Sequence, residues 1–426
     1  MELKPGYKQT DLGMIPADWE VVEIGDLNPF VTSGSRGWAE FYSDMGFPFI
    51  RITNLSRESI SLDLTDLKLV KLPYRVSEGT RTQLENDDVL ISITADIGII
   101  GYVTASVQKP AYINQHIALV RFDSAKANAR FASYFLACER SQRLFRASTD
   151  QGAKAGMSLG AIRKIRLALP LAPEQRAIAA ALSDVDALIG ALEKLIAKKR
   201  DIRQGAIQRL LSGKQRLPGF GGHWEVKRLG DLAALHRENV TPAGFPDQMF
   251  VHFSIPAFDC GKVPVVEPGS AIGSGKFRVP INAVLVSKLN PRIPRVWAPN
   301  AIPLNSVAST EFLVLKPRAE VSRRFLCLIC SSAAFVERMQ LSATGTTGSH
   351  QRINPWDALN IEVAVPVELE EQRAIAAVLN DMDAEIAALQ KKRDKTRALK
   401  QGMMQELLTG RIRLPMPAEE EVAATP

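Results

Sequence analysis

The residues of this chain that have suitable types for catalysis do not form a complete catalytic motif. An adenine methyltransferase loop has the order Asn/Asp-Pro-Pro-Tyr/Phe, and Asn28-Pro29-Phe30 lacks the second proline; no glycine-rich cofactor turn follows a predicted strand. A phosphate-binding loop at Gly275-Lys276 would need a glycine in place of Ser270 and a hydroxyl residue in place of Phe277. We therefore expect no catalytic residues in this chain.

The potential metal ligands are equally incomplete. Asp259 and Lys262, which follow Pro246-Asp247, have the outline of a nuclease core, but the spacing between them is one residue too long. The five histidines, at positions 116, 223, 236, 252 and 350, show no metal-ligand spacing. Cys327 and Cys330 form one CxxC with no second pair and no nearby histidine, which favours two reduced cysteines on a helix over a zinc site. We expect no bound metal.

Polar side chains on predicted loops offer a different chemistry, which is hydrogen bonding to nucleic acid. Arginine, lysine, amide and hydroxyl side chains bind base edges and phosphates. In the first half of the chain the candidate DNA-binding residues are Ser35, Arg36, Arg51, Asn54, Thr94, Gln151 and Lys154. The alternative for each of them is an ordinary solvated loop residue.

The second half of the chain contains a further set of candidate DNA-binding residues. They are His252, Ser254, Lys288, Asn290, Arg292, Arg295, Thr346, His350, Gln351 and Arg352. The segment from 288 to 295 is the strongest, because three cations lie among prolines that stiffen the loop. His252 and Ser254 lie on a predicted strand and could equally be structural.

These loops are held by a long segment that occurs twice. EQRAIAAALSDVDALIGALEK begins at Glu174, and EQRAIAAVLNDMDAEIAALQK begins at Glu371, 197 residues later. The copies align without a gap through Pro218 and Pro415, with 26 of 45 positions identical. This period is far longer than the roughly 20–50 residues of a solenoid unit. The repeat therefore predicts two domain-sized halves that each end in the same long helix.

Apolar residues recur along both copies at the spacing of a narrow helical seam. They are Ile178, Leu182, Val185, Ile189 and Leu192 in the first copy, and Ile375, Leu379, Met382, Ile386 and Leu389 in the second. Two similar seams related by a pseudo-twofold axis are self-complementary, so we predict that the helices pair as an antiparallel coiled coil. The alternative is that each helix covers the core of its own half. Gly213 and Gly410, which follow paired leucines, predict the C-terminal ends.

Two bodies of dissimilar sequence lie before the two helices. In the first, Pro48–Thr53, Asp88–Ile93, Ala111–Phe122 and Ile165–Pro170 are predicted strands, and Asn128–Arg146 is a predicted helix. In the second, the predicted strands are Phe250–Ile255, Ala283–Ser287, Glu311–Lys316 and Ile361–Pro366, and the predicted helix is Arg323–Met339. The order of these elements indicates an α+β fold.

Composition and element order together suggest a division of the chain. Its 426 residues are enough for two to three domains. We predict an entry segment (1–27), a first domain (28–170), a central helix (171–218), a second domain (219–366), a C-terminal helix (367–415) and a disordered tail (416–426). A net charge of +7 hints at a polyanionic partner. No apolar run of 18 residues and no signal-peptide pattern is present, so we expect a cytoplasmic protein.

Several of these motifs together resemble the specificity subunit of Type I restriction–modification systems, over nearly the whole chain. The motifs are the duplicated PxxEQRAIAxxL helix, the closing LLTGRIRLP, the entry segment GYKQTDLGMIPADWEV, the run SIPAFDCGKVPVVEPGSAIGSGKFRVPINAVLVSKLNPRIPRVW and TGTTGSHQRI. The first domain, with TSGSRGWAEFYSDMGFPFIRITNLS, follows the family outline more loosely than the second.

The resemblance implies a non-catalytic DNA-binding subunit with two globular target-recognition domains. Each domain would read one half of a split, asymmetric DNA sequence. The helices would set the unread spacer and carry two methylation subunits, to which restriction/translocase subunits join. S-adenosylmethionine, ATP and magnesium would be used by these partners, and this chain itself would bind no cofactor.

Two other classes of function remain open from the sequence. The chain could be the recognition half of a methyltransferase or nuclease enzyme, which the missing catalytic motifs oppose. It could also be a coiled-coil scaffold that reads no sequence, which the two unlike domains oppose. A steep salt dependence of binding without sequence preference would support the scaffold.

Overall fold

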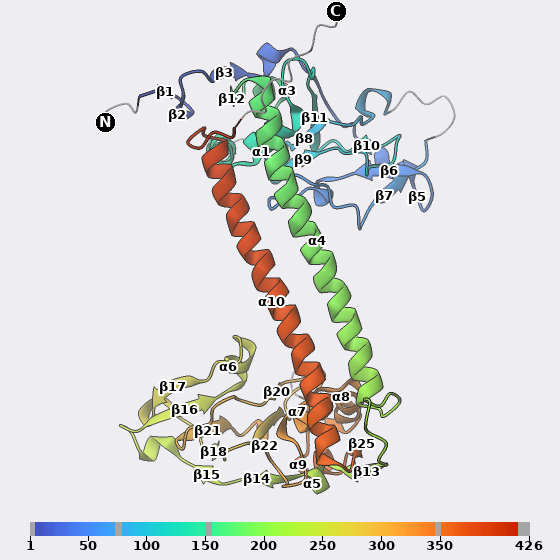
Figure 1. The fold of residues 1–426 in the computed structure, drawn as a ribbon, viewed down its shortest axis with the longest axis vertical. Coiled ribbons are helices and arrows are strands. Elements are labelled where there is room, and N and C mark those ends of the chain that lie inside the picture. Colours follow the sequence, from blue (N-terminus) through green and yellow to red (C-terminus); the bar gives the residue numbers. More distant parts are fainter. Residues whose placement is uncertain (1–4, 73–78, 150–155, 346–350, 416–426) are drawn as a thin grey trace, which may run out of the picture. The chain divides into compact units, whose positions relative to one another are not determined.

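The computed structural model describes residues 5–72, 79–149, 156–345 and 351–415, so the predicted tail lies outside the described residues. The chain divides into two compact units, unit 1 (residues 1–193 and 391–426) and unit 2 (residues 194–390). Two helices of 39 residues, α4 (Ala172–Leu210) and α10 (Leu369–Leu407), contribute to both units (Figure 1). The boundaries between the units therefore cut both long helices, whereas the sequence division gave each helix a segment of its own.

Both long helices end where the repeat predicts. Gly213 and Gly410 follow the last helical turns with φ of 69° and 68°, a left-handed conformation that glycine adopts without strain. A Cβ at Gly213 would lie 3.1 Å from the ring of Trp224, and one at Gly410 would lie 2.3 Å from Cγ of Pro16. Glycine is thus required at both ends for its conformation and for the close approach of the following chain.

Unit 1 is built on an antiparallel sheet of four strands in the order β4-β11-β8-β9. A second sheet has the order β10-β6-β7-β5, in which β10 and β6 are parallel. Two shorter antiparallel pairs are β1 with β2 and β12 with β3. The strands are β1 (Tyr7–Thr10), β2 (Gly13–Pro16), β3 (Glu20–Glu23), β4 (Phe30–Ser33), β5 (Tyr42–Ser43), β6 (Phe47–Ile50), β7 (Lys68–Val70), β8 (Val89–Ser92), β9 (Ile100–Tyr102), β10 (Tyr112–Ile113), β11 (Ile117–Arg121) and β12 (Arg166–Leu169).

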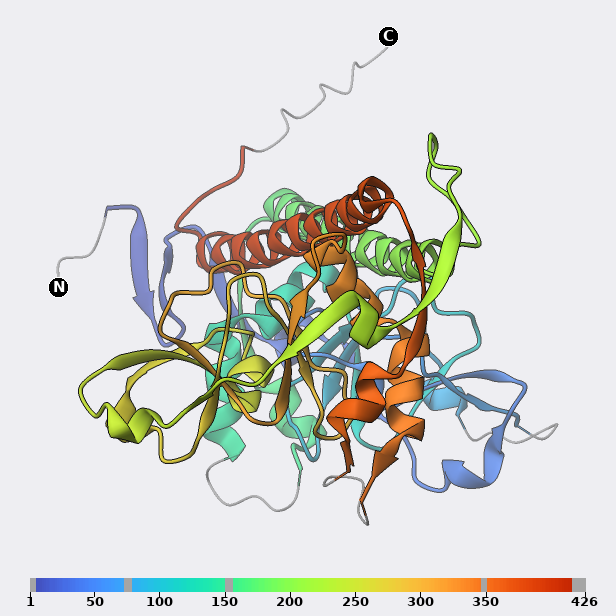
Figure 2. The same ribbon diagram turned by 90° about the horizontal axis from the view of Figure 1, so that it is seen from below.

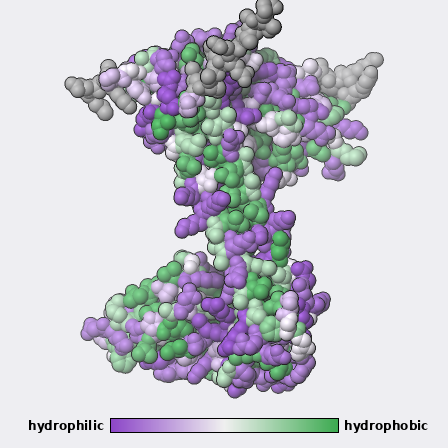
Figure 3. Space-filling view, in the orientation of Figure 1, coloured by the Kyte–Doolittle hydropathy of each residue, from purple (hydrophilic) through white to green (hydrophobic). Residues whose placement is uncertain are grey.

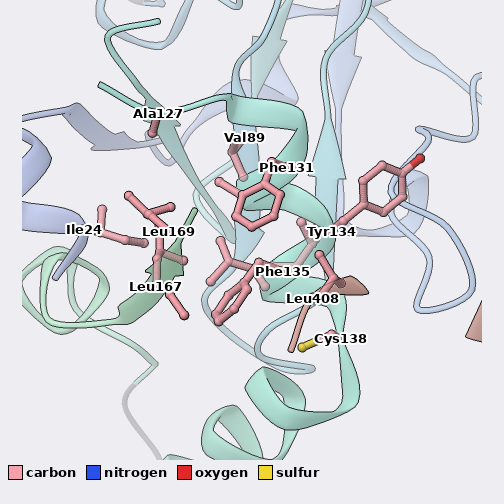
Figure 4. Packing of buried hydrophobic residues seen from close by; sticks show 14 of the residues in the cluster. Ile24, Val89, Ala127, Phe131, Tyr134, Phe135, Cys138, Leu167, Leu169 and Leu408 are labelled. Atoms are coloured by element: carbon pink, nitrogen blue, oxygen red, sulfur yellow. The ribbon is translucent and has the colours of Figure 1, made fainter. Parts of the chain in front are cut away.

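The core of unit 1 lies between its central sheet and the helices α1 (Ala129–Ala137) and α2 (Glu139–Thr149). Figure 4 shows Phe131 and Phe135 of α1 packed close to Val89 of β8 and to Leu408, which follows α10. All four side chains are at most 1% exposed. The end of one long helix is therefore part of this core, as are Ile178 and Leu182 near the start of the other.

The two ends of the described chain also meet in unit 1. The hairpin β1–β2 stands beside the C-terminal end of α10 in both views (Figures 1 and 2). The Tyr7 hydroxyl donates to the Gly410 carbonyl at 2.9 Å, and the buried Trp19 packs in the same core as Leu408. The entry segment thus completes unit 1 together with the closing residues of the second repeat.

Unit 2 contains a four-stranded antiparallel sheet, β14-β22-β19-β20, a five-stranded sheet, β15-β18-β21-β16-β17, and two pairs, β13 with β25 and β23 with β24. Its strands are β13 (Trp224–Arg228), β14 (Ala233–His236), β15 (Asn239–Val240), β16 (Met249–Phe253), β17 (Val265–Pro268), β18 (Lys276–Arg278), β19 (Val284–Ser287), β20 (Val296–Trp297), β21 (Ser306–Ser309), β22 (Phe312–Pro317), β23 (Ala343–Thr344), β24 (Arg352–Ile353) and β25 (Glu362–Pro366). Its shorter helices are α5 (Leu229–Leu232), α6 (Ile255–Asp259), α7 (Arg323–Ser331), α8 (Ala333–Leu341) and α9 (Pro355–Leu359).

The two units have the same topology despite their unlike sequences. The order β4-β11-β8-β9 of unit 1 corresponds to β14-β22-β19-β20 of unit 2, and the parallel pair β6/β10 corresponds to β16/β21. The pair of short helices α1 and α2 corresponds to α7 and α8, and α3 (Leu159–Arg163) corresponds to α9. In their second sheets, the described part of unit 2 adds β15 and β18, and that of unit 1 adds β5. Positions can therefore be compared between the units strand by strand.

The structure corrects the two helices that we predicted between the strands. Each of them is two helices, because the chain leaves the helical conformation at Cys138 and at Ser332, with ψ of 153° and 147°. The Ser332 hydroxyl accepts the Phe335 amide at 3.3 Å and starts α8 anew. The sequence does not show this break, because both short helices bury an apolar face in the same core and their apolar spacing continues across the junction, as α7 and α8 do in unit 2.

The repeated Glu-Gln pair at the start of each long helix ties that helix to its domain. The Gln175 side chain accepts the Asn128 amide at 2.8 Å and donates to the Pro170 carbonyl at 2.9 Å. In unit 2 the Gln372 side chain accepts the Ser322 amide at 2.9 Å and donates to the Pro366 carbonyl at 3.0 Å. The identical residues of the repeat therefore hold identical junctions between domain and helix.

Candidate nucleic-acid interface

In unit 1 three segments that are distant in sequence lie side by side at the end of the central strand β8. The Ile93 amide, just after β8, donates to the His116 carbonyl at 2.9 Å. The Met157 amide, where the chain is described again after residues 150–155, donates to the Ile93 carbonyl at 2.7 Å. Backbone hydrogen bonds thus fix the order 116, 93 and 157. We call this set of residues the three-segment row of unit 1. The corresponding row of unit 2 consists of residues 311, 288 and 353 in that order.

Unit 2 repeats this arrangement with different side chains. The Lys288 amide, after β19, donates to the Glu311 carbonyl at 2.9 Å, and the Ile353 amide donates to the Lys288 carbonyl at 3.1 Å. A further backbone contact joins Asn290 to Gln351, whose carbonyl accepts the Asn290 amide at 2.7 Å. The row therefore brings together two segments that the sequence analysis had predicted separately.

Several candidates of unit 2 lie on its row or on the loop that begins there. Arg352 pairs with Glu311, with Nε 3.1 Å from Oε2, and its side chain is 46% exposed. Arg292 is exposed on the loop that begins at Lys288. Asn290 is 9% exposed in a left-handed conformation, with φ of 47°, and its Oδ1 has no hydrogen-bond partner among the described residues. An exposed guanidinium on a loop fixed by backbone hydrogen bonds can reach base edges or phosphates.

Other candidates in unit 2 are held within the protein. The Ser254 hydroxyl caps α6 by accepting the Ala257 amide at 3.2 Å. Arg295 is bidentate on Asp259, at 2.7 and 2.9 Å, and these hydrogen bonds lower the pKa of that carboxyl. His252 is hydrogen-bonded to Glu267 at 2.7 Å, but burial lowers the pKa of His252 against the opposing effect of that carboxylate. In this structure these three side chains stabilise the domain.

In unit 1 the candidates are similarly divided. Asn54 is buried and binds the Asp63 and Asp66 carbonyls, and Arg51 contacts Asp66. Thr94 directly follows Ile93 of the row and is hydrogen-bonded to Nδ1 of His116 at 2.5 Å. Arg36 is exposed, and the Ser35 hydroxyl accepts from Arg81 at 3.4 Å. The remaining candidates lie outside the described residues; they are Gln151, Lys154, Thr346 and His350.

Sequence reasoning missed several polar residues of the rows. Gln115 and His116 precede β11, and Glu311 precedes β22. Gln115 is hydrogen-bonded to Nε2 of His116 at 3.0 Å. Their position could have indicated them, because each stands directly before a buried strand, where a polar side chain is left outside the core.

Salt bridges join the two long helices within each unit. In unit 1, Lys400 contacts Asp186 at 2.6 Å and Arg397 contacts Glu193 at 2.7 Å. In unit 2, Lys199 contacts Glu385 at 2.6 Å and Arg203 donates to Asp383 at 2.7 Å. In both units the residue numbers fall along one helix as they rise along the other. The helices are therefore antiparallel neighbours in each unit.

Two further ion pairs, each with one residue beyond the end of a long helix, are reciprocal between the copies of the repeat. Arg216 is bidentate on the buried Glu371, with both distances 2.6 Å, and Arg413 contacts the buried Glu174 in the equivalent way, with Nη2 2.6 Å from Oε2. The start of each copy thus pairs with the end of the other. Hydrogen bonds to Asp18 and Glu174 raise the pKa of Arg413. The two copies of the repeat therefore make equivalent contacts at their ends.

The apolar seam of the helices has two parts. Ile178, Leu182, Ile375, Leu379 and Met382 pack into the cores of their units, as the alternative reading proposed. Leu192 and Ile386 are buried further along the helices, at 5% and 8% exposure, and Val185, Ile189 and Leu389 are half-buried. Pairing of the two helices along the whole seam stays a prediction. The seam residues near the start of each helix pack into the core of the domain before it.

In the part of the chain that the structure describes, no group of three or more histidine, cysteine, aspartate or glutamate residues is placed to hold a metal ion. Within the same ranges no helix has the length and apolarity to cross a membrane. Cys327 and Cys330 lie on α7 with free thiols.

Comparison with known proteins agrees with this arrangement. Residues 16–199 match the model of the Type I restriction modification DNA specificity domain. A putative type I restriction enzyme MjaX specificity subunit of Methanocaldococcus jannaschii is 23% identical over 436 residues, which cover 96% of this chain and 97% of that protein. A Type-I restriction-modification S subunit from M. genitalium has a similar fold, with a TM-score of 0.57 at 13% identity over 98% of this chain and 99% of that one. A chain from a structure of the type I R-M system has a TM-score of 0.51 at 18% identity, covering 93% and 99%.

Two α+β units of one topology, each of which contains part of both repeated long helices, make up the described chain. The chain is thus similar over nearly its whole length to Type I specificity subunits, and its residues 16–199 match the model of their DNA specificity domain.

Proposed function

We propose that this chain reads a bipartite DNA sequence, one half with each unit, for a Type I restriction–modification complex. The observation that carries the proposal is the pair of three-segment rows. They occupy equivalent places in two units of one topology but present different side chains, as two unlike half-sites require. The identical parts of the repeat are used for joining domains and helices, where no sequence is read.

The long helices are proposed to dock the methylation subunits. Figure 3 shows hydrophobic side chains on the surface of these helices. On α4 the exposed residues Leu188, Leu195 and Ile202 recur every seven residues and so lie on one face of that helix. Leu399 of α10 is 58% exposed. Because the helix repeat occurs twice, we propose two methylation subunits, with restriction/translocase subunits joining them.

Cofactors are assigned to the partners in this proposal. S-adenosylmethionine would serve the methylation subunits, and ATP and magnesium would serve the restriction/translocase subunits. This chain would contribute only recognition and assembly, in the cytoplasm where its DNA is found.

Single-molecule sequencing of methylated adenine tests the proposal directly. The experiment uses cells that carry this chain with its neighbouring methyltransferase, and matched cells from which only this chain has been deleted. We expect methylation at one split motif with a fixed unread gap, and its loss on deletion. Methylation that is unchanged after deletion would leave a scaffold that reads no sequence as the better account.

A further inference from the structure

Backbone hydrogen bonds hold the first residue of each three-segment row, His116 or Glu311, in a fixed position. The His116 amide donates to the Asn114 side chain at 3.2 Å, and the Glu311 amide donates to the Ser309 hydroxyl at 3.3 Å. Both carbonyls accept the strand-end amide of their row at 2.9 Å. The next residue, Ile117 or Phe312, begins a buried strand. The backbone at 116 and 311 is therefore bonded on both sides and anchored to the core, which preorganises the side chain.

The side chains at these two positions differ in chemistry while their backbones do not. The His116 ring is hydrogen-bonded to Thr94 from the second segment and to its neighbour Gln115. The Glu311 carboxylate accepts from Arg352 of the third segment, and its side chain is 27% exposed. An imidazole can donate or accept, a carboxylate accepts from the cytosine amino group, and an arginine beside it can bind guanine.

The contacts made by the identical residues of the repeat follow another pattern. The glutamines that tie helix to domain are the same in both units, and so are the arginine–glutamate pairs at the ends of the repeat. The rows combine one invariant backbone scheme with unlike, partly exposed polar side chains. That combination is the one a reader of two different half-sites needs.

We infer that His116 and Glu311 are the equivalent specificity-determining positions of the two units. His116, with Thr94, contributes to reading one half-site, and Glu311, with Arg352, contributes to reading the other. This inference rests on the proposed function and names residues within it.

The test measures the methylated motif in cells that carry His116→Ala or Glu311→Gln. The preference for a base pair in one half-site should fall about 5- to 150-fold in each variant, the range of a lost base-edge contact. The half-site affected should differ between the two variants, and the spacer should not change. His223→Gln and Glu238→Gln serve as controls, since His223 is 74% exposed and Glu238 pairs with Arg278 on another part of unit 2.

Three results separate the possible failures. Wild-type motifs in both variants would overturn the inference and leave the proposed function intact. Binding by the purified variants that weakens equally for every base substitution would also overturn it, because such a loss is structural. Should the wild-type chain itself direct no split motif, the proposed function fails first. If an alanine or glutamine variant does not fold, as judged by its thermal denaturation, His116→Gln and Glu311→Asp replace it and face the same criteria.

Discussion

At the scale of single residues, two candidate arginines of one loop differ in whether they already bind a carboxylate of their own unit. Arg295 and Arg292 are three residues apart in one loop, yet the first is bidentate on Asp259 and the second is exposed. From the sequence alone, the two arginines were equivalent candidates for DNA binding. The available side chain, Arg292, is the one from which a DNA contact is expected.

Arg292→Ala should relax the reading of one half-site only. Loss of a bidentate arginine contact to guanine costs about 1–3 kcal/mol of discrimination. Arg292→Lys is the matched control, because it keeps the charge and loses the planar fork, so overall affinity should survive better than specificity. Motif sequencing and binding to single-base variants of the site measure both. Equal effects on the two half-sites would contradict assignment of this loop to one domain.

His252 gives a prediction on pH. Burial lowers the pKa of His252 in the folded protein, so its contribution to stability is present above the ordinary value of about 6.5 and is lost as the pH falls through the lowered folded pKa. Urea unfolding of the wild type should therefore show stability that declines below about pH 6.5. The His252→Gln variant should show a shallower decline over that window. An identical pH profile in the variant would remove His252 from this role.

At the scale of elements, a buried polar contact joins the two long helices in unit 1. Lys400 is 4% exposed and contacts Asp186 at 2.6 Å, while the Tyr134 hydroxyl of α1 donates to the same carboxylate at 2.7 Å. Burial, together with the negative charge of Asp186, raises the pKa of Tyr134. Domain and both helices thus meet at one carboxylate.

Lys400→Met should destabilise the protein by about 3–5 kcal/mol, because it leaves a carboxylate in a low-dielectric site without its cation. Adding Asp186→Asn should recover much of that loss, since the uncompensated charge is then gone. Chemical denaturation of the wild type, both single variants and the double variant gives the coupling between the two side chains. Strictly additive effects would show that the pair is not coupled.

The repeated helices also predict how the spacer is set. Matched removal of whole turns from Ala187–Arg203 and Ala384–Lys400 shortens both helices equally, by about 1.5 Å per residue. The unread gap in the methylated motif should change while the bases of both half-sites stay the same. Removal from one helix alone breaks the register of the inter-helix salt bridges and serves as the control. A change in the bases read would show that these turns take part in recognition.

At the scale of the whole molecule, the two units share a topology and differ in the side chains that they present. Replacing residues 28–170 by the first domain of another specificity subunit should change one half-site and leave the other. Sequencing of the methylated motif measures the outcome. Changes in both half-sites would contradict independent reading by the two units.

The sequence by itself determined the elements of this protein. The positions of both long helices follow from local patterns, since apolar spacing and the glycines at 213 and 410 act over a few residues. The α+β order and most strands were predictable for the same reason. The split at Cys138 and Ser332 was not, because two short helices that bury one face give the same periodicity as one long helix.

Only the tertiary structure decided which residues meet. The reciprocal pairs of Arg413 with Glu174 and Arg216 with Glu371 join residues 239 and 155 positions apart, and no local pattern specifies such partners. The same holds for the rows, where backbone hydrogen bonds bring His116 to Ile93 and Glu311 to Lys288. A sequence shows which side chains are able to bind DNA. The fold determines which of them are already bonded to the protein and which remain available.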